Sequence, residues 1–142
     1  MDDKVKKAIE KAVAEEPFAR ALNLELVELD EGSSAVEMMF DSGSMGNIFS
    51  MAHGGAIFAL IDEAFETACN AYGTVAVALN MNITYIASPA PGSRLRAEAK
   101  EVSRTRKTGT YEIRVTDQDG KLLAVCQALC YRRSVPLPFL DD

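Results

Sequence analysis

The sequence predicts an α+β fold in which one long buried helix is enclosed by antiparallel strands. Three observations lead to this prediction. Residues 54–71 have the pattern of an apolar helix, residues 75–132 alternate with the period of strands, and a predicted strand pair precedes the helix. Successive strands arranged around one helix are typical of α+β proteins rather than of parallel α/β sheets.

The chain has 142 residues, which suits one domain spanning residues 1–142 with a substantial core. Its first 17 residues predict an additional N-terminal surface helix, because Val5, Ile9 and Val13 recur every four residues among charged side chains. Pro17 is expected to end or bend this helix, and residues 18–22 to add one further turn.

A hairpin and a long loop should follow. Residues 24–30 and 34–40 are predicted to be strands joined by a turn around Gly32. Residues 41–52 hold two glycines and three serines and are predicted to form the longest loop, and long loops in compact domains are often functional. The helix over residues 54–71, closed by Gly73, begins with an apolar run that predicts burial in the concave face of a curled sheet.

Four consecutive strands are expected after Gly73. The first, over residues 75–85, should place its large apolar residues on one face and its small or polar residues on the other. The second should place the charged residues Arg94, Arg96, Glu98 and Lys100 on one face, which suits a sheet face exposed to solvent. The remaining strands flank a tight turn at Asp119-Gly120, and the tail over residues 134–142 should be extended because of its prolines.

Composition excludes several classes of protein. The net charge of -6 argues against nucleic acid as a partner. No apolar run is long enough to span a membrane, and the charged N-terminus does not resemble a signal peptide, so a cytoplasmic protein is expected. The three cysteines are expected to be buried and reduced, and the single histidine, His53, excludes a histidine-rich metal site. A carboxylate-rich metal site stays open, although no spacing supports it. We expect no metal and no cofactor.

Two features around the central helix point to chemistry. Gly54 and Gly55 open the helix, where backbone N–H groups lack partners and can bind a developing negative charge. A tight turn into a buried helix would favour the same glycines. Asp62 either borders the buried apolar stripe, where desolvation would raise its basicity, or lies on the wetted edge of the helix.

The spacing of Gly54 and Asp62 bears on assembly. Eight residues of helix separate them by about 12 Å, whereas an oxyanion donor and an attacking group must both reach one reacting centre. If both residues are catalytic, two antiparallel copies must share the site, and the protein is at least a dimer.

The segment from Asn47 to Asp62 resembles one enzyme family. An asparagine lies six residues before His53, His-Gly-Gly opens the helix, and an acid follows nine residues after the histidine. Together these residues are similar to the hotdog-fold acyl-CoA thioesterases, specifically the PaaI-like, phenylacetate-pathway branch of the 4-hydroxybenzoyl-CoA thioesterase superfamily. The resemblance extends from about residue 22 to residue 132. It implies a hotdog fold, hydrolysis of an acyl-CoA substrate without a cofactor, and a homodimer that often pairs into a homotetramer.

The resemblance also implies roles for individual residues. Asp62 would act as nucleophile or as general base, and the Gly54 N–H would bind the thioester oxygen. Asn47 would position the carbonyl or the water, with His53 in a supporting role and Gly55 beside the substrate. Many relatives carry a serine or threonine where this chain has Ala78, so a polar atom must come from elsewhere, for example Asn80.

Basic residues suggest where the substrate phosphates bind. Arg104, Arg106 and Lys107 cluster near a strand end and suit the phosphates of coenzyme A, although a merely solvated basic loop explains them nearly as well. Arg132 and Arg133 form a second, less supported patch.

Two other functions are compatible with the same fold. A non-catalytic acyl-CoA-binding module gains support from the missing hydroxyl at Ala78. A hydratase is disfavoured, because that chemistry needs a histidine paired with an acid and His53 lies in the glycine motif.

Overall fold

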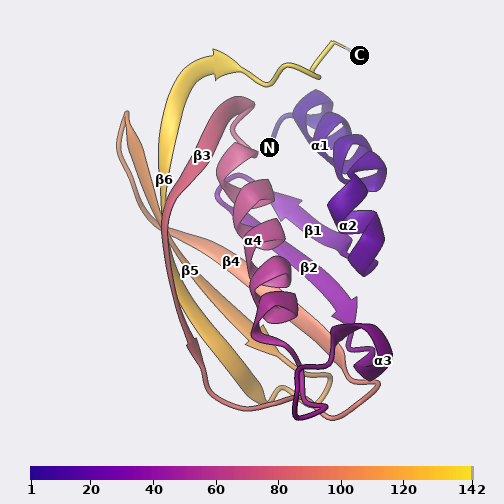
Figure 1. Cartoon of the computed structure of the whole chain (residues 1–142). Helices are drawn as coiled ribbons and strands as arrows, with labels where there is room; N and C mark the ends of the chain where they lie inside the picture. The colour runs from indigo at the N-terminus through magenta and orange to yellow at the C-terminus, as the bar shows by residue number, and fades with distance from the viewer. Residues whose placement is uncertain (142) are drawn as a thin grey trace.

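The computed structural model describes residues 1–141 and contains a six-stranded antiparallel sheet that curls around one long helix (Figure 1). The strand order is β1-β2-β4-β5-β6-β3, which places β3 at one edge of the sheet. The strands are β1 (Glu25–Asp30), β2 (Ser33–Met39), β3 (Thr74–Tyr85), β4 (Arg94–Arg104), β5 (Thr108–Thr116) and β6 (Leu122–Pro136). The predicted α+β architecture is confirmed.

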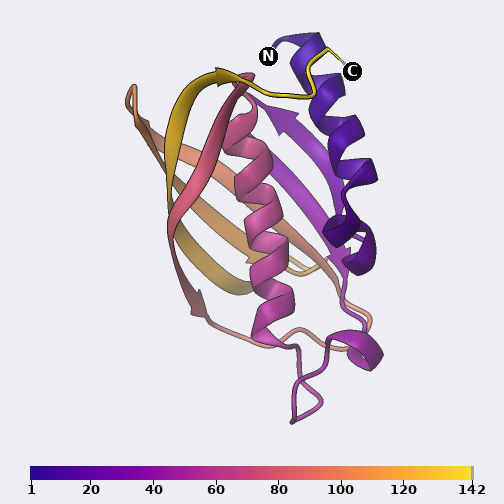
Figure 2. The ribbon, with the colours of Figure 1, turned by 45° about the horizontal axis from the view of Figure 1, so that its top comes forward.

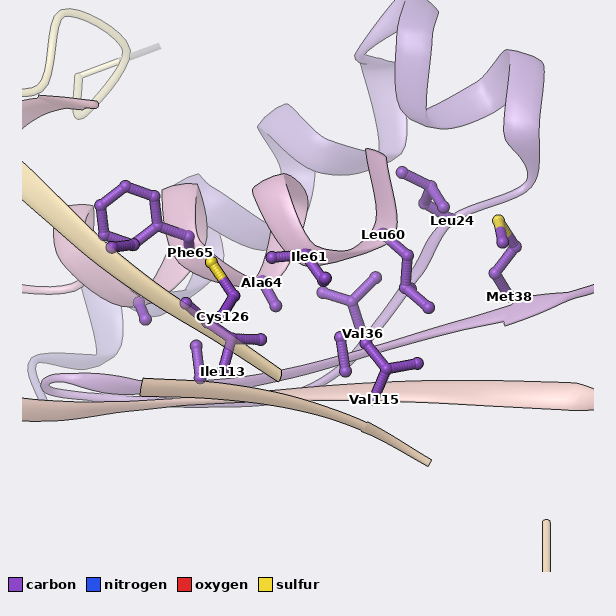
Figure 3. Close-up of a cluster of buried hydrophobic side chains, with 14 of the residues drawn as sticks. Leu24, Val36, Met38, Leu60, Ile61, Ala64, Phe65, Ile113, Val115 and Cys126 are labelled. Carbon is purple, nitrogen blue, oxygen red and sulfur yellow. The ribbon is translucent and has the colours of Figure 1, made fainter. Parts of the chain in front are cut away.

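The central helix α4 (Gly54–Asn70) lies in the concavity of the sheet, with α1 (Asp3–Glu15) running along its other side (Figure 2). Leu60, Ile61 and Phe65 of α4 are fully buried. They face side chains of β2, β5 and β6, as the close-up of the core shows (Figure 3). Each such side chain contributes about 1.5–3 kcal/mol through burial, so the apolar sequence of α4 is what fixes it inside the sheet.

The N-terminal segment forms two helices, as the sequence predicts. Asp2 caps α1 by accepting a hydrogen bond from the Lys4 N–H at 2.8 Å, and Ile9 and Val13 bury the inner face of the helix. Pro17 is the first residue of α2 (Pro17–Leu22), where its missing N–H costs nothing. Glu16 therefore lies at the junction of α1 and α2.

The predicted loop over residues 41–52 is more ordered than expected. Its first part forms the one-turn helix α3 (Ser42–Met45), because the Asp41 carboxylate accepts a hydrogen bond from the Gly43 N–H at 3.0 Å. Met45 is buried and anchors this turn in the core. The loop is consequently held at both ends, at Met45 and at the start of α4.

The predicted alternation along β3 is wrong beyond residue 78. Ala78 pairs with Cys130 and Asn80 pairs with Leu129, so Leu79 is an extra residue that no residue of β6 opposes. This bulge exchanges the two faces of the strand. As a result, Met81 and Ile83 pack against the core, while Asn80 shares the convex face with Leu129.

The C-terminal strand is longer than predicted. β6 continues to Pro136, so residues 134–136 of the predicted tail belong to the sheet, and Leu137 is buried. Residue 142, the end of that predicted tail, lies outside the described residues. The three cysteines are free and buried, as expected. Over residues 1–141, we find no helix with the length and apolar character required to cross a membrane.

Candidate active site

The start of α4 leaves one backbone donor free. His53 caps the helix, and its Nδ1 accepts a hydrogen bond from the Gly55 N–H at 2.9 Å. The N–H groups of Ala56 and Ile57 both donate to the His53 carbonyl. Within residues 1–141 the Gly54 N–H has no acceptor, so it is the donor that remains available at the positive end of the helix.

This arrangement assigns different tasks to the three residues of the His-Gly-Gly motif. His53 uses Nδ1 as an acceptor, which places its ring proton on Nε2 and suits a structural cap rather than a base. Gly55, predicted to contact substrate, has its N–H occupied by His53 although the residue itself is exposed. Gly54 alone offers an unused N–H.

Asn47 organises the loop that precedes the helix. Its Oδ1 accepts hydrogen bonds from the Phe49 N–H at 2.9 Å and from the Met51 N–H at 3.1 Å. Because the amide oxygen is engaged inside the loop, the Nδ2 group is the part of this side chain that can donate outward. Asn47 and Gly54 line the same cleft, which has a volume of about 320 Å³.

Tyr85 is a residue of this cleft to which the sequence assigned no role. Its hydroxyl donates a hydrogen bond to the Gly54 carbonyl at 3.0 Å. A β-carbon at position 54 would lie 3.2 Å from the Tyr85 ring, so glycine is what allows this close contact. The bulge at Leu79 turns Tyr85 toward the helix, and no feature of the sequence marks that bulge.

Asp62 lies two turns further along α4 and is partly buried. Burial raises the pKa of the Asp62 carboxyl above its ordinary value. Asp62 lies in a stripe of exposed or half-buried residues on the side of α4 that the sheet and α1 leave partly uncovered. The stripe consists of Gly55, Phe58, Asp62 and Glu66.

The structure does not bring Gly54 and Asp62 together within one chain. They remain eight residues apart on one helix, a separation of about 12 Å. The β3 residues are also divided, because Ala78 lies on the same face as Cys130 while Asn80 lies on the convex face. One copy of the chain therefore holds the predicted catalytic groups as separate parts.

The predicted phosphate-binding residues are rearranged by the fold. Arg104 and Arg106 share a cleft of about 500 Å³ with Arg132 and Arg133, which joins the two basic patches into one. The Arg104 and Arg132 guanidinium groups lie 3.8 and 4.9 Å from the centre of the Tyr72 ring. Lys107 does not line this cleft and instead lies over the Tyr131 ring at 5.5 Å.

One basic group in this cleft lacks a partner. The Nη1 atom of Arg132 is buried without a hydrogen bond to any residue of the described chain. A buried guanidinium donor with no acceptor favours an anionic ligand, because leaving such a donor unpaired is costly. This cleft lies near Thr74, at the end of α4 opposite Gly54.

Known proteins share this fold and sequence pattern. Residues 49–124, more than half of the chain, match the model of the thioesterase superfamily. A candidate esterase of Archaeoglobus fulgidus is 38% identical over 117 residues, which cover 82% of this chain and 75% of the relative. The acyl-coenzyme A thioesterase PaaI of Escherichia coli is 33% identical over 114 residues, covering 80% of this chain and 81% of that protein.

Solved structures agree with these relatives. The E. coli PaaI protein, from the phenylacetic acid degradation operon, superposes with a TM-score of 0.88 at 29% identity, covering 94% of this chain and 96% of that one. A Streptococcus mutans protein bound to acetyl CoA superposes with a TM-score of 0.75 at 26% identity, covering 81% and 92%. The chain therefore belongs to the thioesterase superfamily, and the hotdog fold and thioester-hydrolase class predicted from its sequence are confirmed.

Proposed function

We propose that this thioester hydrolase cleaves acyl-CoA to a free acid and coenzyme A, in a site that two copies of the chain build together. The observation that carries the proposal is the Gly54 N–H, the one donor at the start of α4 that is left without an acceptor among the described residues. A free N–H at a helix N-terminus suits the oxygen of a thioester carbonyl, which becomes negative as the carbonyl is attacked.

Asp62 supplies the attacking group or activates it. In the first route the carboxylate removes a proton from water, the water oxygen bonds to the acyl carbon, and the carbon–sulfur bond breaks. In the second route the carboxylate itself bonds to the acyl carbon, and water then hydrolyses the mixed anhydride. Both routes use one water, and the thiolate leaves and takes up a proton. The raised pKa of Asp62 supports either role, because it makes the carboxylate a stronger base.

The geometry of the sheet supports the sharing of the site. β3 has a neighbour on one side only, which is β6, so its other edge is free to pair with another strand. This edge carries exposed apolar side chains, including Leu79 at 57% exposure. Two β3 strands paired antiparallel about a two-fold axis would extend the sheet and bring the two α4 helices side by side.

The same symmetry gives a position for the axis. If Gly54 of one copy faces Asp62 of its partner, the two helices cross midway between these residues, at Phe58 of each copy. Phe58 is 39% exposed, which is unusual for a phenylalanine on an otherwise buried helix. Contact between two Phe58 rings at the axis would remove this apolar surface from water.

Coenzyme A is the thiol partner that the chain and its relatives favour. Four arginines line one cleft, and the unpaired Nη1 of Arg132 suits a phosphate oxygen. The E. coli relative is named as an acyl-coenzyme A thioesterase, and the S. mutans structure holds acetyl CoA.

The test is a panel of acyl-CoA esters of aryl, short and medium acyl groups, assayed for release of free thiol. We expect turnover by the natural chain and a loss of at least about 100-fold in kcat for Asp62→Asn, since the carboxylate takes part in bond formation. Asp119→Asn, the same change at an exposed turn, should keep full activity. Thermal stabilisation by acyl-CoA without thiol release would instead identify a non-catalytic acyl-CoA-binding module.

A further inference from the structure

Three glutamates from two parts of the chain meet beside the stripe of α4 that carries Asp62, at the end of the helix away from Gly54. Glu16 comes from the junction of α1 and α2, whereas Glu63 and Glu66 come from α4. One carboxylate oxygen from each lies within 4.8 Å of the other two. The fold therefore brings three acids together across the contact between the N-terminal helices and the central helix.

Glu63 makes this cluster unlike a solvated acidic surface. The residue is only 3% exposed, and its Oε1 is buried without a hydrogen-bond partner among residues 1–141. Burial, with the negative charges of Glu16, Glu66 and Asp62, raises the pKa of Glu63 to about 8. An unpaired carboxylate oxygen in such a place is costly, and a bound cation would satisfy it.

Within residues 1–141, no positively charged side chain lines the cavity beside this cluster. A cavity of about 480 Å³ adjoins the cluster. It is lined by apolar side chains of α1, β3 and the C-terminal segment, by Thr67 and Asn70 of α4, and by Glu15 and the three acids. None of its lining residues is lysine, arginine or histidine. The cavity has room for a cation and several water molecules.

We propose that Glu16, Glu63 and Glu66 form a binding site for a divalent cation of the Ca²⁺ type. Carboxylate oxygens are the ligands that hard cations prefer, and Ca²⁺ holds them at about 2.3–2.6 Å, so that opposite ligands lie about 4.6–5.2 Å apart. Three oxygens within 4.8 Å of one another are close enough to bind one such cation. Mg²⁺ usually keeps several waters and is bound through one or two carboxylates, so three carboxylates favour Ca²⁺.

A cation at this site would connect two parts of the fold. Glu16 is the residue at which α1 ends and α2 begins, and Glu63 and Glu66 lie on successive turns of α4. A shared cation would therefore tie the N-terminal helices to the central helix. Asp62 is the neighbour of Glu63 but is not a ligand in this site, so the proposed cation binding does not depend on the proposed acyl-CoA chemistry.

The test is isothermal titration calorimetry of the full chain with CaCl₂ at pH 8, after removal of metal with EDTA and exchange into metal-free buffer. We expect one Ca²⁺ per chain and at least about tenfold weaker binding by Glu63→Gln, because a neutral amide replaces the buried carboxylate. Glu10→Gln, the same substitution at an exposed position of α1, should bind as the natural chain does.

A second measurement keeps the proposal testable if Glu63→Gln binding is hard to quantify. Ca²⁺ should raise the Tm of the natural chain and of Glu10→Gln and leave that of Glu63→Gln unchanged. Circular dichroism would establish that Glu63→Gln is folded. Absence of binding by the natural chain, equal binding by Glu63→Gln, or binding of Mg²⁺ as tightly as Ca²⁺ would overturn the proposal.

Discussion

The hydroxyl of Tyr85 donates a hydrogen bond to the carbonyl of Gly54, across 3.0 Å, from the edge strand to the first residue of the central helix. This contact holds the peptide group that follows the free Gly54 N–H, and the absence of a side chain on Gly54 allows it. We therefore expect Tyr85 to position the proposed oxyanion donor through the backbone of Gly54.

Replacing Tyr85 with phenylalanine should lower kcat without unfolding the chain. A single neutral hydrogen bond contributes about 1 kcal/mol, so its loss should reduce kcat by about three- to tenfold, with little change in KM. The measurement is steady-state thiol release, with Tm as the check on folding. Tyr131→Phe, which removes a hydroxyl from an exposed tyrosine of β6, is the matched control. An unchanged kcat would show that this hydrogen bond does not position the donor.

Mixing two inactive variants should restore activity if two copies share each site. Asp62→Asn lacks the carboxylate, and Gly54→Val blocks the approach to the N–H, so each variant alone should be nearly inactive. A mixed dimer contains one site with Asp62 from one copy and Gly54 from the other. Random exchange should therefore recover about a quarter of the natural activity, since half the dimers are mixed and each has one intact site.

The complementation assay needs the two variants unfolded and refolded together, with each variant refolded alone as its control. Thiol release is the readout. Recovery of activity requires Gly54 and Asp62 to act across two chains. If no activity returns although mixed dimers are detected by mass spectrometry, each copy must hold a complete site of its own.

The fold could be predicted because it follows from local patterns. The apolar run of α4, the spacing of Val5, Ile9 and Val13, and the turn at Asp119-Gly120 each depend on residues that are close in sequence. The bulge at Leu79, in contrast, could not be predicted from neighbouring residues. Its residue is apolar and continues the alternation of its neighbours, so only pairing with β6 reveals that one residue is extra.

The candidate site could be predicted only where its residues are consecutive. His53, Gly54 and Gly55 take their tasks from adjacent positions at a helix start. Contacts between distant segments could not be predicted from the sequence, because they depend on the register in which the strands pair. The pairing of Thr108 with Tyr131 is what brings the β4–β5 turn to the end of β6 and unites the arginines in one cleft.

The basic cleft gives a prediction about substrates with and without phosphate groups. Arg106→Gln combined with Arg133→Gln should raise KM for acyl-CoA by about tenfold, because two charge-assisted contacts to phosphate are weakened. The same variant should hydrolyse an acyl thioester of N-acetylcysteamine, which carries no phosphate, at the natural rate. Lys121→Gln, at the exposed β5–β6 turn, should change neither. Equal effects on both substrates would place the phosphates elsewhere.

The pH dependence of activity should reflect Asp62. The chemistry requires the ionised carboxylate, and burial raises the pKa of Asp62 above that of an exposed aspartate. Activity should therefore fall as the pH drops through this raised pKa, at a higher pH than an exposed aspartate would give. The profile of kcat/KM against pH measures this value, with Tm recorded at each pH to exclude unfolding.

The pH dependence of stability should reflect Glu63. Its pKa is about 8 in the folded chain and 4.5 as an ordinary glutamate, so folding favours the protonated form. The stabilisation is complete below pH 4.5, where both states are protonated, and is lost as the pH rises to about 8, because only the unfolded state ionises in this range. The loss for a residue 3% exposed is on the order of 4–5 kcal/mol.

Glu63→Gln isolates this contribution from those of the neighbouring acids Glu16, Asp62 and Glu66, which remain in the variant. Glutamine resembles the protonated glutamate and does not titrate, so the variant and the natural chain should have similar stability near pH 4.5. The variant should become progressively more stable than the natural chain toward pH 8. Guanidinium unfolding midpoints between pH 4.5 and 9, in EDTA, measure the difference. A constant difference across this range would mean that Glu63 has the same pKa in both states, and that its burial is relieved by a partner other than a proton.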